Sequence, residues 1–202
     1  MTKKTQSPYG SWKSPITTDL IVANTIGLGE IMLSGQDVYW LEMRPGESGR
    51  YVIVRKRPGE PFEDVNSFPY NARTRVHEYG GGSYLAADDT VYFSHFDDQR
   101  IYRHVSADDI EPITPEGDYR YADAVHDASR ARLICVREDH TQPGKEAINT
   151  IVAIDTEGQT ETEVLVCGSD FYSNPGLSPD GKSLCWLSWM HPNMPWDNTE
   201  LW

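Results

Sequence analysis

Short runs of alternating or continuous apolar residues, each bounded by turn residues, recur along the chain and predict β-strands. Four pairs of runs are separated by short polar segments and predict hairpins: residues 37–43 with 50–56, 90–96 with 100–105, 131–139 with 148–155, and 182–189 with a strand starting in 199–202. Gly, Pro and Asp clusters interrupt almost every helical period. The pattern therefore predicts an all-β protein.

The hairpins repeat as one larger unit. Each is preceded by a turn of similar chemistry, and the first strands follow one another at intervals of roughly 40 to 55 residues, close to the period of propeller blades. Further strand candidates at 82–87, 121–125 and 162–168 supply about four strands per repeat. We therefore expect residues 1–202 to form part of a β-propeller, with about three to four blades of four-stranded antiparallel sheet. A β-sandwich is the weaker alternative, because it would not need this longer repeat.

The last residues of the chain bear on whether this propeller is open or closed. Pro179, Asp180 and Gly181 form a turn signal before the run 182–189, and four tryptophans follow closely: Trp186, Trp189, Trp196 and Trp202. A blade needs a neighbour on each face, and leaving the apolar residues of this last run half covered would forfeit about 6 to 12 kcal/mol. We therefore expect an open or truncated propeller, with self-association through exposed blade edges. A small closed unit is the alternative.

Composition narrows the class of protein. Asp and Glu outnumber Lys and Arg by 31 to 18, and the net charge of -13 disfavours nucleic acid as a partner. No apolar region follows the N-terminal lysines and no apolar run is long enough for a membrane span, so we expect a cytoplasmic protein. The three cysteines lack a CxxC spacing and are expected to be buried free thiols.

Several stretches resemble a known family. They are "NARTRVHEYGGGSY" (71–84), "VYFSHFDDQRIYR" (91–103), "RYADAVHDASRARLICVREDH" (120–140) and "GSDFYSNPGLSPDGKSLCWLSWMHPNMPWDNTELW" (168–202). Together they resemble the N-terminal propeller of the prolyl oligopeptidase family of serine peptidases, in its bacterial dipeptidyl aminopeptidase and acylaminoacyl-peptidase-like branch. The resemblance implies a propeller that precedes an α/β-hydrolase domain, covers its active site and limits entry to peptides or acyl-peptides.

Catalytic chemistry is not expected within these residues. An α/β-hydrolase nucleophile needs a G-x-S-x-G elbow, and the sequence has none; Ser83 in "GGGSY" is better explained as a turn serine. The triple glycine matches no phosphate-binding pattern and is expected to allow a close backbone approach or an unusual turn. We predict no catalytic residue, no cofactor and no hydrolysis by this chain alone.

The histidines and acids give no metal motif. Six histidines are scattered without HExxH spacing, and "REDH" (137–140) is expected to be a solvated loop, so no metal site is predicted. The loop with Arg75, His77, Glu78 and Tyr79 is better explained as a structural loop, but if residues of this chain contact substrate, these four are the candidates, because function favours loops. The segment 189–197 is rich in Pro, Met and aromatic residues. Packing between blades or against a hydrolase domain is expected for it, and contact with a peptide is the alternative.

Three functions follow from these features. The first is a non-catalytic propeller fragment of a serine peptidase that gates peptide access to a hydrolase domain outside this chain. The alternative is a free-standing propeller-like module that binds a peptide or protein. A third is a propeller hydrolase with a central metal, which would need inward-facing acidic and Asn residues.

Overall fold

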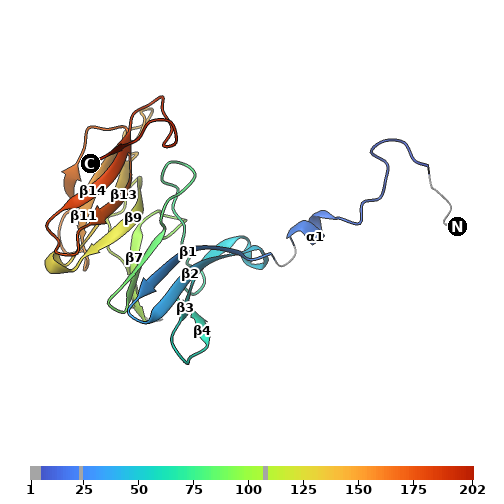
Figure 1. Ribbon diagram of the computed structural model, residues 1–202, viewed down its shortest axis with the longest axis horizontal. Coiled ribbons are helices and arrows are strands. Elements are labelled where there is room, and N and C mark those ends of the chain that lie inside the picture. Colours follow the sequence, from blue (N-terminus) through green and yellow to red (C-terminus); the bar gives the residue numbers. More distant parts are fainter. Residues whose placement is uncertain (1–5, 23–24, 107–108) are drawn as a thin grey trace.

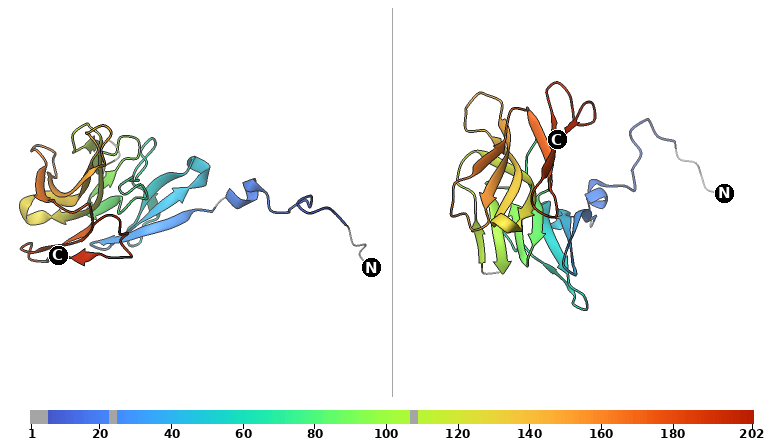
Figure 2. Two further views of the ribbon diagram at one scale, coloured as in Figure 1. Left: turned by 90° about the horizontal axis from the view of Figure 1, so that it is seen from above. Right: turned by 60° about the vertical axis from the view of Figure 1, so that its left-hand side comes forward.

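The structure, a computed structural model, describes residues 6–22, 25–106 and 109–202. The described residues form four antiparallel sheets that follow one another along the chain and are arranged as the blades of a β-propeller (Figures 1 and 2). Blade 1 contains β1 (Gly27–Ser34), β2 (Asp37–Arg44), β3 (Arg50–Lys56) and β4 (Phe62–Asp64). Blade 2 contains β5 (Tyr84–Ala87), β6 (Thr90–Ser94), β7 (Ile101–Ser106) and β8 (Asp109–Pro112). Blade 3 contains β9 (Tyr119–Asp127), β10 (Arg132–Asp139), β11 (Ile148–Asp155) and β12 (Glu163–Val166), and blade 4 contains β13 (Phe171–Leu177), β14 (Leu184–Trp189) and β15 (Glu200–Leu201).

Helical structure is slight. It consists, in the described ranges, of α1 (Thr18–Val22) and the 3-10 turns η1 (Pro45–Glu47) and η2 (Ala128–Arg130). The segment 6–22, which includes α1, extends away from the blades (Figure 1). Neither α1 nor any other helix in the described part of the chain is long and apolar enough to cross a bilayer.

The predicted hairpins are confirmed, whereas four other strands were not predicted. β2 pairs with β3, β6 with β7, β10 with β11, and β14 with β15, each antiparallel. β4 and β8 are short edge strands with few apolar residues, so they leave no alternating pattern. β1 and β13 escaped prediction because glycine, proline or polar residues interrupt their apolar alternation.

The first strands of successive blades lie side by side near the centre of the propeller. In β1, β9 and β13 the pairing register shifts around a residue in the left-handed conformation, namely Glu30, Asp123 and Asn174. Such a bulge turns a side chain out of its strand, and here the side chains of Glu30 and Asp123 bond to neighbouring blades. Glu30 accepts a hydrogen bond from the Ser83 N–H (2.8 Å).

The hydrophobic core lies between blades. One cluster joins blades 1 and 2 through residues such as Tyr39, Ile53 and Phe93. A second joins blades 2 and 3, and a third joins blades 3 and 4. Within the described residues no core cluster joins blade 4 to blade 1, and β1 leaves Leu28, Ile31 and Leu33 more than 70% exposed. The four blades thus form an open series with three packed interfaces.

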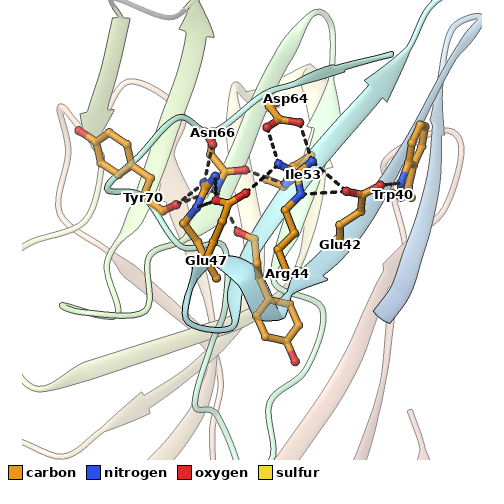
Figure 3. A network of polar contacts seen from close by, with 10 residues as sticks. Trp40, Glu42, Arg44, Glu47, Ile53, Asp64, Asn66 and Tyr70 are labelled. Carbon is orange, nitrogen blue, oxygen red and sulfur yellow. Dashed lines mark hydrogen bonds and ion pairs between the residues drawn. The ribbon is translucent and has the colours of Figure 1, made fainter. Parts of the chain in front are cut away.

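Polar contacts anchor the connection that leaves blade 1 (Figure 3). Arg44 of β2 makes a two-pronged ion pair with Asp64 of β4, with distances of 2.6 and 2.7 Å. Asn66, which follows β4, accepts a hydrogen bond from the Ile53 N–H (2.7 Å), and the Arg50 guanidinium donates to the Asn66 and Tyr70 carbonyls. Because Asn66 and Arg50 are buried, these bonds fix the start of the long connection 65–83 on blade 1.

The cysteine prediction is correct for one residue and wrong for two. Cys135, in the centre of β10, is fully buried, and burial raises the pKa of its thiol far above the ordinary value. Cys167 and Cys185 are exposed, and Cys185 lies on β14 in the blade whose second face has no neighbour among the described residues. The tryptophans near the end of the chain also differ in exposure: Trp189 is buried, while Trp196 and Trp202 are exposed.

Candidate functional site

A cavity of about 900 Å³ opens between the connection 65–83, blade 3 and blade 4. Its polar and charged lining includes His77, Glu78, Arg120, Glu138, His140 and Asp170. Its aromatic and apolar lining includes Tyr79, Phe171, Trp189 and Met194. A concave site with an apolar wall and a few convergent polar groups has the usual properties of a ligand pocket.

The loop 75–80 reaches the cavity through an unusual backbone. His77 and Glu78 are both left-handed, with φ of 56° and 64°. The Glu78 N–H donates to the Arg75 carbonyl (2.9 Å) and the Gly80 N–H to the Val76 carbonyl (2.8 Å), which closes a compact turn. Left-handed residues other than glycine cost about 1 to 2 kcal/mol each, so surrounding contacts must hold this loop in place.

Glu138 provides the main contact to this loop. Its side chain, only 5% exposed, comes from the end of β10, and its Oε1 accepts a hydrogen bond from the His77 N–H (2.7 Å). The other oxygen lies 3.0 Å from His140 Nε2 and 3.7 Å from Arg120 Nη1. The carboxylate is thus surrounded by one backbone donor and three side chains that can carry positive charge.

The His77 ring extends the contact to blade 4. Its Nε2 lies 3.0 Å from the Tyr172 carbonyl of β13, and its Nδ1 lies 3.4 Å from Glu138 Oε1. The ring also packs against Trp189 and Phe171, which stack on each other with centroids 5.4 Å apart. One side chain from the blade 1 to blade 2 connection therefore touches both blade 3 and blade 4.

Electrostatics favour an ionised Glu138. Burial alone would raise the pKa of this carboxyl, but the hydrogen bonds from His77 and His140 outweigh burial and lower the pKa. For Tyr79, burial raises the pKa, and the charges of Glu138 and Asp123 add to the rise. The cavity therefore contains a fixed buried anion and a neutral phenol beside it at ordinary pH.

Three of the four residues assigned to substrate contact line the cavity, and one does not. His77, Glu78 and Tyr79 are in the lining. Arg75 lies outside it: its N–H donates to Gln99 Oε1 (2.7 Å), and its guanidinium lies over the Phe96 ring. Arg120 connects Arg75 to the residues of the lining, because its Nη1 donates both to Glu78 Oε1 (2.6 Å) and to the Arg75 carbonyl (3.0 Å). Whether the lining residues bind substrate remains a prediction.

The expectation of a solvated loop at residues 137–140 is wrong, whereas the strand predicted over 131–139 is confirmed. Arg137, Glu138 and Asp139 are the last residues of β10 rather than a solvated loop, and Glu138 is buried at the cavity. Trp189 and Met194 also line the cavity, in the segment 189–197 for which packing was favoured over peptide contact, and Phe171 of β13 lines it as well. A charged residue at the alternating inward position of an apolar strand was the available signal for Glu138.

Comparison with known proteins indicates the family to which the chain belongs. A puromycin-hydrolyzing peptidase from Mycobacterium tuberculosis is similar over 98% of this chain, with 38% identity and a TM-score of 0.85. A puromycin hydrolase is similar over 98% of the chain, with 31% identity and a TM-score of 0.86. The chain spans 33% of the length of each. A prolyl endopeptidase matches at 16% identity with a TM-score of 0.57, over 88% of this chain and 26% of its own, which shows a shared fold.

No protein-family model and no curated protein sequence matches the chain. The structural similarity to the two puromycin-hydrolysing enzymes nevertheless covers all four blades at identities above 30%. The motif resemblance and the structural similarity agree on one family. The chain therefore belongs to the prolyl oligopeptidase family of peptidases and is similar to the propeller portion of its members.

Proposed function

We propose that this chain is the non-catalytic propeller part of a cytoplasmic serine peptidase and that its cavity faces the substrate. In this proposal a separate α/β-hydrolase domain cleaves the bond, and the propeller limits which peptides or acyl-peptides reach it. The observation that carries the proposal is the cavity: loops from three parts of the propeller converge on it, and it is lined by residues of the motif that first indicated the family.

The substrates named for the similar proteins suggest a first compound to test. Two of them hydrolyse puromycin, an aminoacyl amide. We propose that an aminoacyl amide or short peptide of similar size occupies this cavity on its way to cleavage. The aromatic wall of Phe171 and Trp189 would contact an apolar side chain, and the polar lining would orient the backbone.

Kinetics of the protein made from the complete reading frame test this proposal. Tyr79 lines the cavity and is 62% exposed, so Tyr79→Ala removes a contact surface with little effect on packing. We expect the KM for puromycin to rise about 5- to 10-fold with kcat nearly unchanged, because a binding contact is lost.

Phe68→Ala is the matched control, since Phe68 is 84% exposed and lies outside the cavity lining. Equal KM values for Tyr79→Ala and the wild-type protein would contradict the proposed site. The 202-residue chain alone should leave puromycin intact, and hydrolysis by it would contradict a non-catalytic role.

A free-standing binding module is the second candidate. It is favoured by one observation, that the connection 65–83 and blades 3 and 4 form a cavity of about 900 Å³ with both aromatic and charged lining residues. Calorimetric titration of puromycin into the 202-residue chain separates the two candidates. Tight binding without a hydrolase domain favours the module, whereas binding that requires the complete protein favours the peptidase.

A further inference from the structure

The cavity loop 75–80 belongs to the connection between blades 1 and 2, yet blade 3 holds it in place. The His77 N–H donates to Glu138 Oε1 across 61 residues of sequence. Two further backbone bonds are internal to the loop, from the Glu78 N–H to Arg75 and from the Gly80 N–H to Val76. Outside the loop, the Arg75 N–H donates to Gln99 between β6 and β7, and His77 Nε2 lies 3.0 Å from the Tyr172 carbonyl of blade 4. Internal bonds can close a turn, but they do not determine where the turn lies relative to the cavity.

Glu138 has the properties needed to fix that position. It is buried, at 4% exposure, and its carboxylate is ionised within a set of donors formed by the His77 N–H, His140 and Arg120. A charged acceptor forms stronger hydrogen bonds than a neutral one, and a buried charge left without partners is costly. The loop and the carboxylate therefore stabilise each other.

The same carboxylate also orders the cavity rim. Arg120 lies 3.7 Å from Glu138 Oε2 and donates to Glu78 Oε1 at 2.6 Å. Glu78 is one of the two left-handed residues, and Tyr79 follows it. Directly through the His77 N–H, and indirectly through Arg120, Glu138 thus holds the two residues that precede Tyr79.

We propose that Glu138 is the positioning residue of this cavity, which holds the loop 75–80 in the geometry that recognises a ligand. The proposal rests on the proposed function, because recognition by the loop presupposes that the cavity binds substrate. Glu138 itself is already occupied by protein donors, so its role is to orient Tyr79 and Glu78 rather than to contact the ligand. Assembly of the site then requires blade 3 as well as the loop.

Hydrogen exchange of the 202-residue chain tests the positioning without any substrate. Glu138→Ala should speed exchange of the His77, Glu78 and Gly80 amides by about 10-fold or more, because the bond that holds the loop is lost. Asp139→Ala is the matched control, since Asp139 is the next residue of β10 and bonds only locally to Thr141 in the described chain. Amides in the centre of β10 and β11 should exchange alike in both variants.

Glu138→Gln is the conservative variant, and it takes the place of Glu138→Ala in the exchange experiment if the alanine variant does not fold. It keeps an oxygen that can accept from the His77 N–H but removes the charge that faces His140 and Arg120. Exchange of the loop amides should lie between the wild-type and alanine values. Loop exchange equal to wild type in both variants would overturn the positioning role, whether or not the chain belongs to an active peptidase.

Kinetics with puromycin test the link to recognition. In the protein from the complete reading frame, Glu138→Gln should raise KM about 5- to 10-fold and leave kcat within about 2-fold, because the loop acts on binding. Loop exchange that rises while KM stays constant would overturn the role in recognition. If the wild-type protein does not hydrolyse puromycin, the proposed function fails in that respect, and the exchange experiment still decides the positioning role.

Discussion

Asp123 connects three blades through one carboxylate. Its Oδ1 accepts a hydrogen bond from the Gly82 N–H (2.6 Å) next to blade 2, and its Oδ2 accepts from the Asn174 N–H (3.0 Å) in blade 4. The residue is left-handed, with φ of 58°, a conformation that Asp and Asn tolerate better than other side chains. Its conformation and its chemistry therefore both suit the centre of the propeller.

Substitutions at Asp123 should separate these two contributions. Asp123→Ala removes both acceptors and strains the backbone, so we expect a loss of about 3 to 5 kcal/mol in the free energy of unfolding, measured by urea titration. Asp123→Asn keeps one acceptor and the tolerated conformation, and should cost about 1 to 2 kcal/mol.

Asp89→Ala is the control for strain alone, because Asp89 is exposed and also left-handed, with φ of 63°. It should cost about 1 kcal/mol. If Asp123→Ala costs no more than Asp89→Ala, the hydrogen bonds between blades contribute little to stability.

Single residues were the hardest features to predict from sequence. The loop residues His77, Glu78 and Tyr79 could be selected because histidine, acid and aromatic side chains adjoin three glycines. The contact between Glu138 and this loop could not be predicted, because His77 is 61 residues away and only the packing of blades brings the two residues together. Cys185 shows the same limit: its apolar strand indicated burial, but exposure depends on which blade lies next to it.

At the scale of elements, two of the three glycines, Gly81 and Gly82, form a close contact with blade 3. A Cβ on Gly81 would lie 3.0 Å from both Ala122 Cβ and Asp123 Oδ1, and one on Gly82 would lie 3.1 Å from Asp123 Oδ1. Gly80 is left-handed, with φ of 93°. The close backbone approach expected from the sequence is therefore confirmed, and it lets the connection cross the inner strand β9.

Gly81→Ala should destabilise the interface between blades 2 and 3. The added methyl group must displace backbone or Asp123, so we expect a loss of about 1 to 3 kcal/mol in a thermal or urea unfolding experiment. Gly46→Ala, where a Cβ meets nothing within 4 Å, should change stability by about 0.5 kcal/mol or less. Equal stability of the two variants would show that the connection can move away from β9.

Strands with a strong apolar pattern were predicted well, and bulged strands were not. β10 and β11 pair along eight consecutive residues, and their apolar runs are continuous. β13 contains Asn174, Pro175 and Gly176, which resemble a turn in sequence but form a bulge within the strand. The physical reason is that the adjoining blade stabilises the irregular backbone, and this contact is not visible in local sequence.

At the scale of the whole molecule, the repeat predicted the propeller and about three to four blades, and the described residues form four. The site could be located only in the structure. The period of the hairpins depends on positions within each blade, so it is visible along the chain. The cavity depends on a connection, the end of β10 and the segment after β14 meeting in space. These three segments lie in different repeats, and no periodicity relates them.

Self-association is the expected behaviour of the exposed outer faces. Leu28, Ile31 and Leu33 on β1 and Leu201 and Trp202 at the other end are each at least 60% exposed. We expect the purified 202-residue chain to associate as its concentration rises, since exposed apolar patches of this kind favour contacts between molecules. Light scattering coupled to size-exclusion chromatography measures the mass.

The double variant Leu28→Glu and Leu33→Glu should shift the chain towards the monomer by placing charge on that face. Phe68→Glu adds a charge at an exposed position of the connection instead and should leave the mass unchanged. A monomeric wild-type chain at all concentrations would contradict this expectation.

The location of the core clusters has a consequence for how such proteins change in evolution. Because each cluster is shared by two adjacent blades, duplication of one repeat in the gene supplies a new unit that already carries both halves of the required interface. Blade number can therefore grow or shrink in whole repeats while the existing interfaces keep their side chains. The cavity loop 75–80 cannot diverge as freely, because its Val76 belongs to the cluster shared by blades 3 and 4.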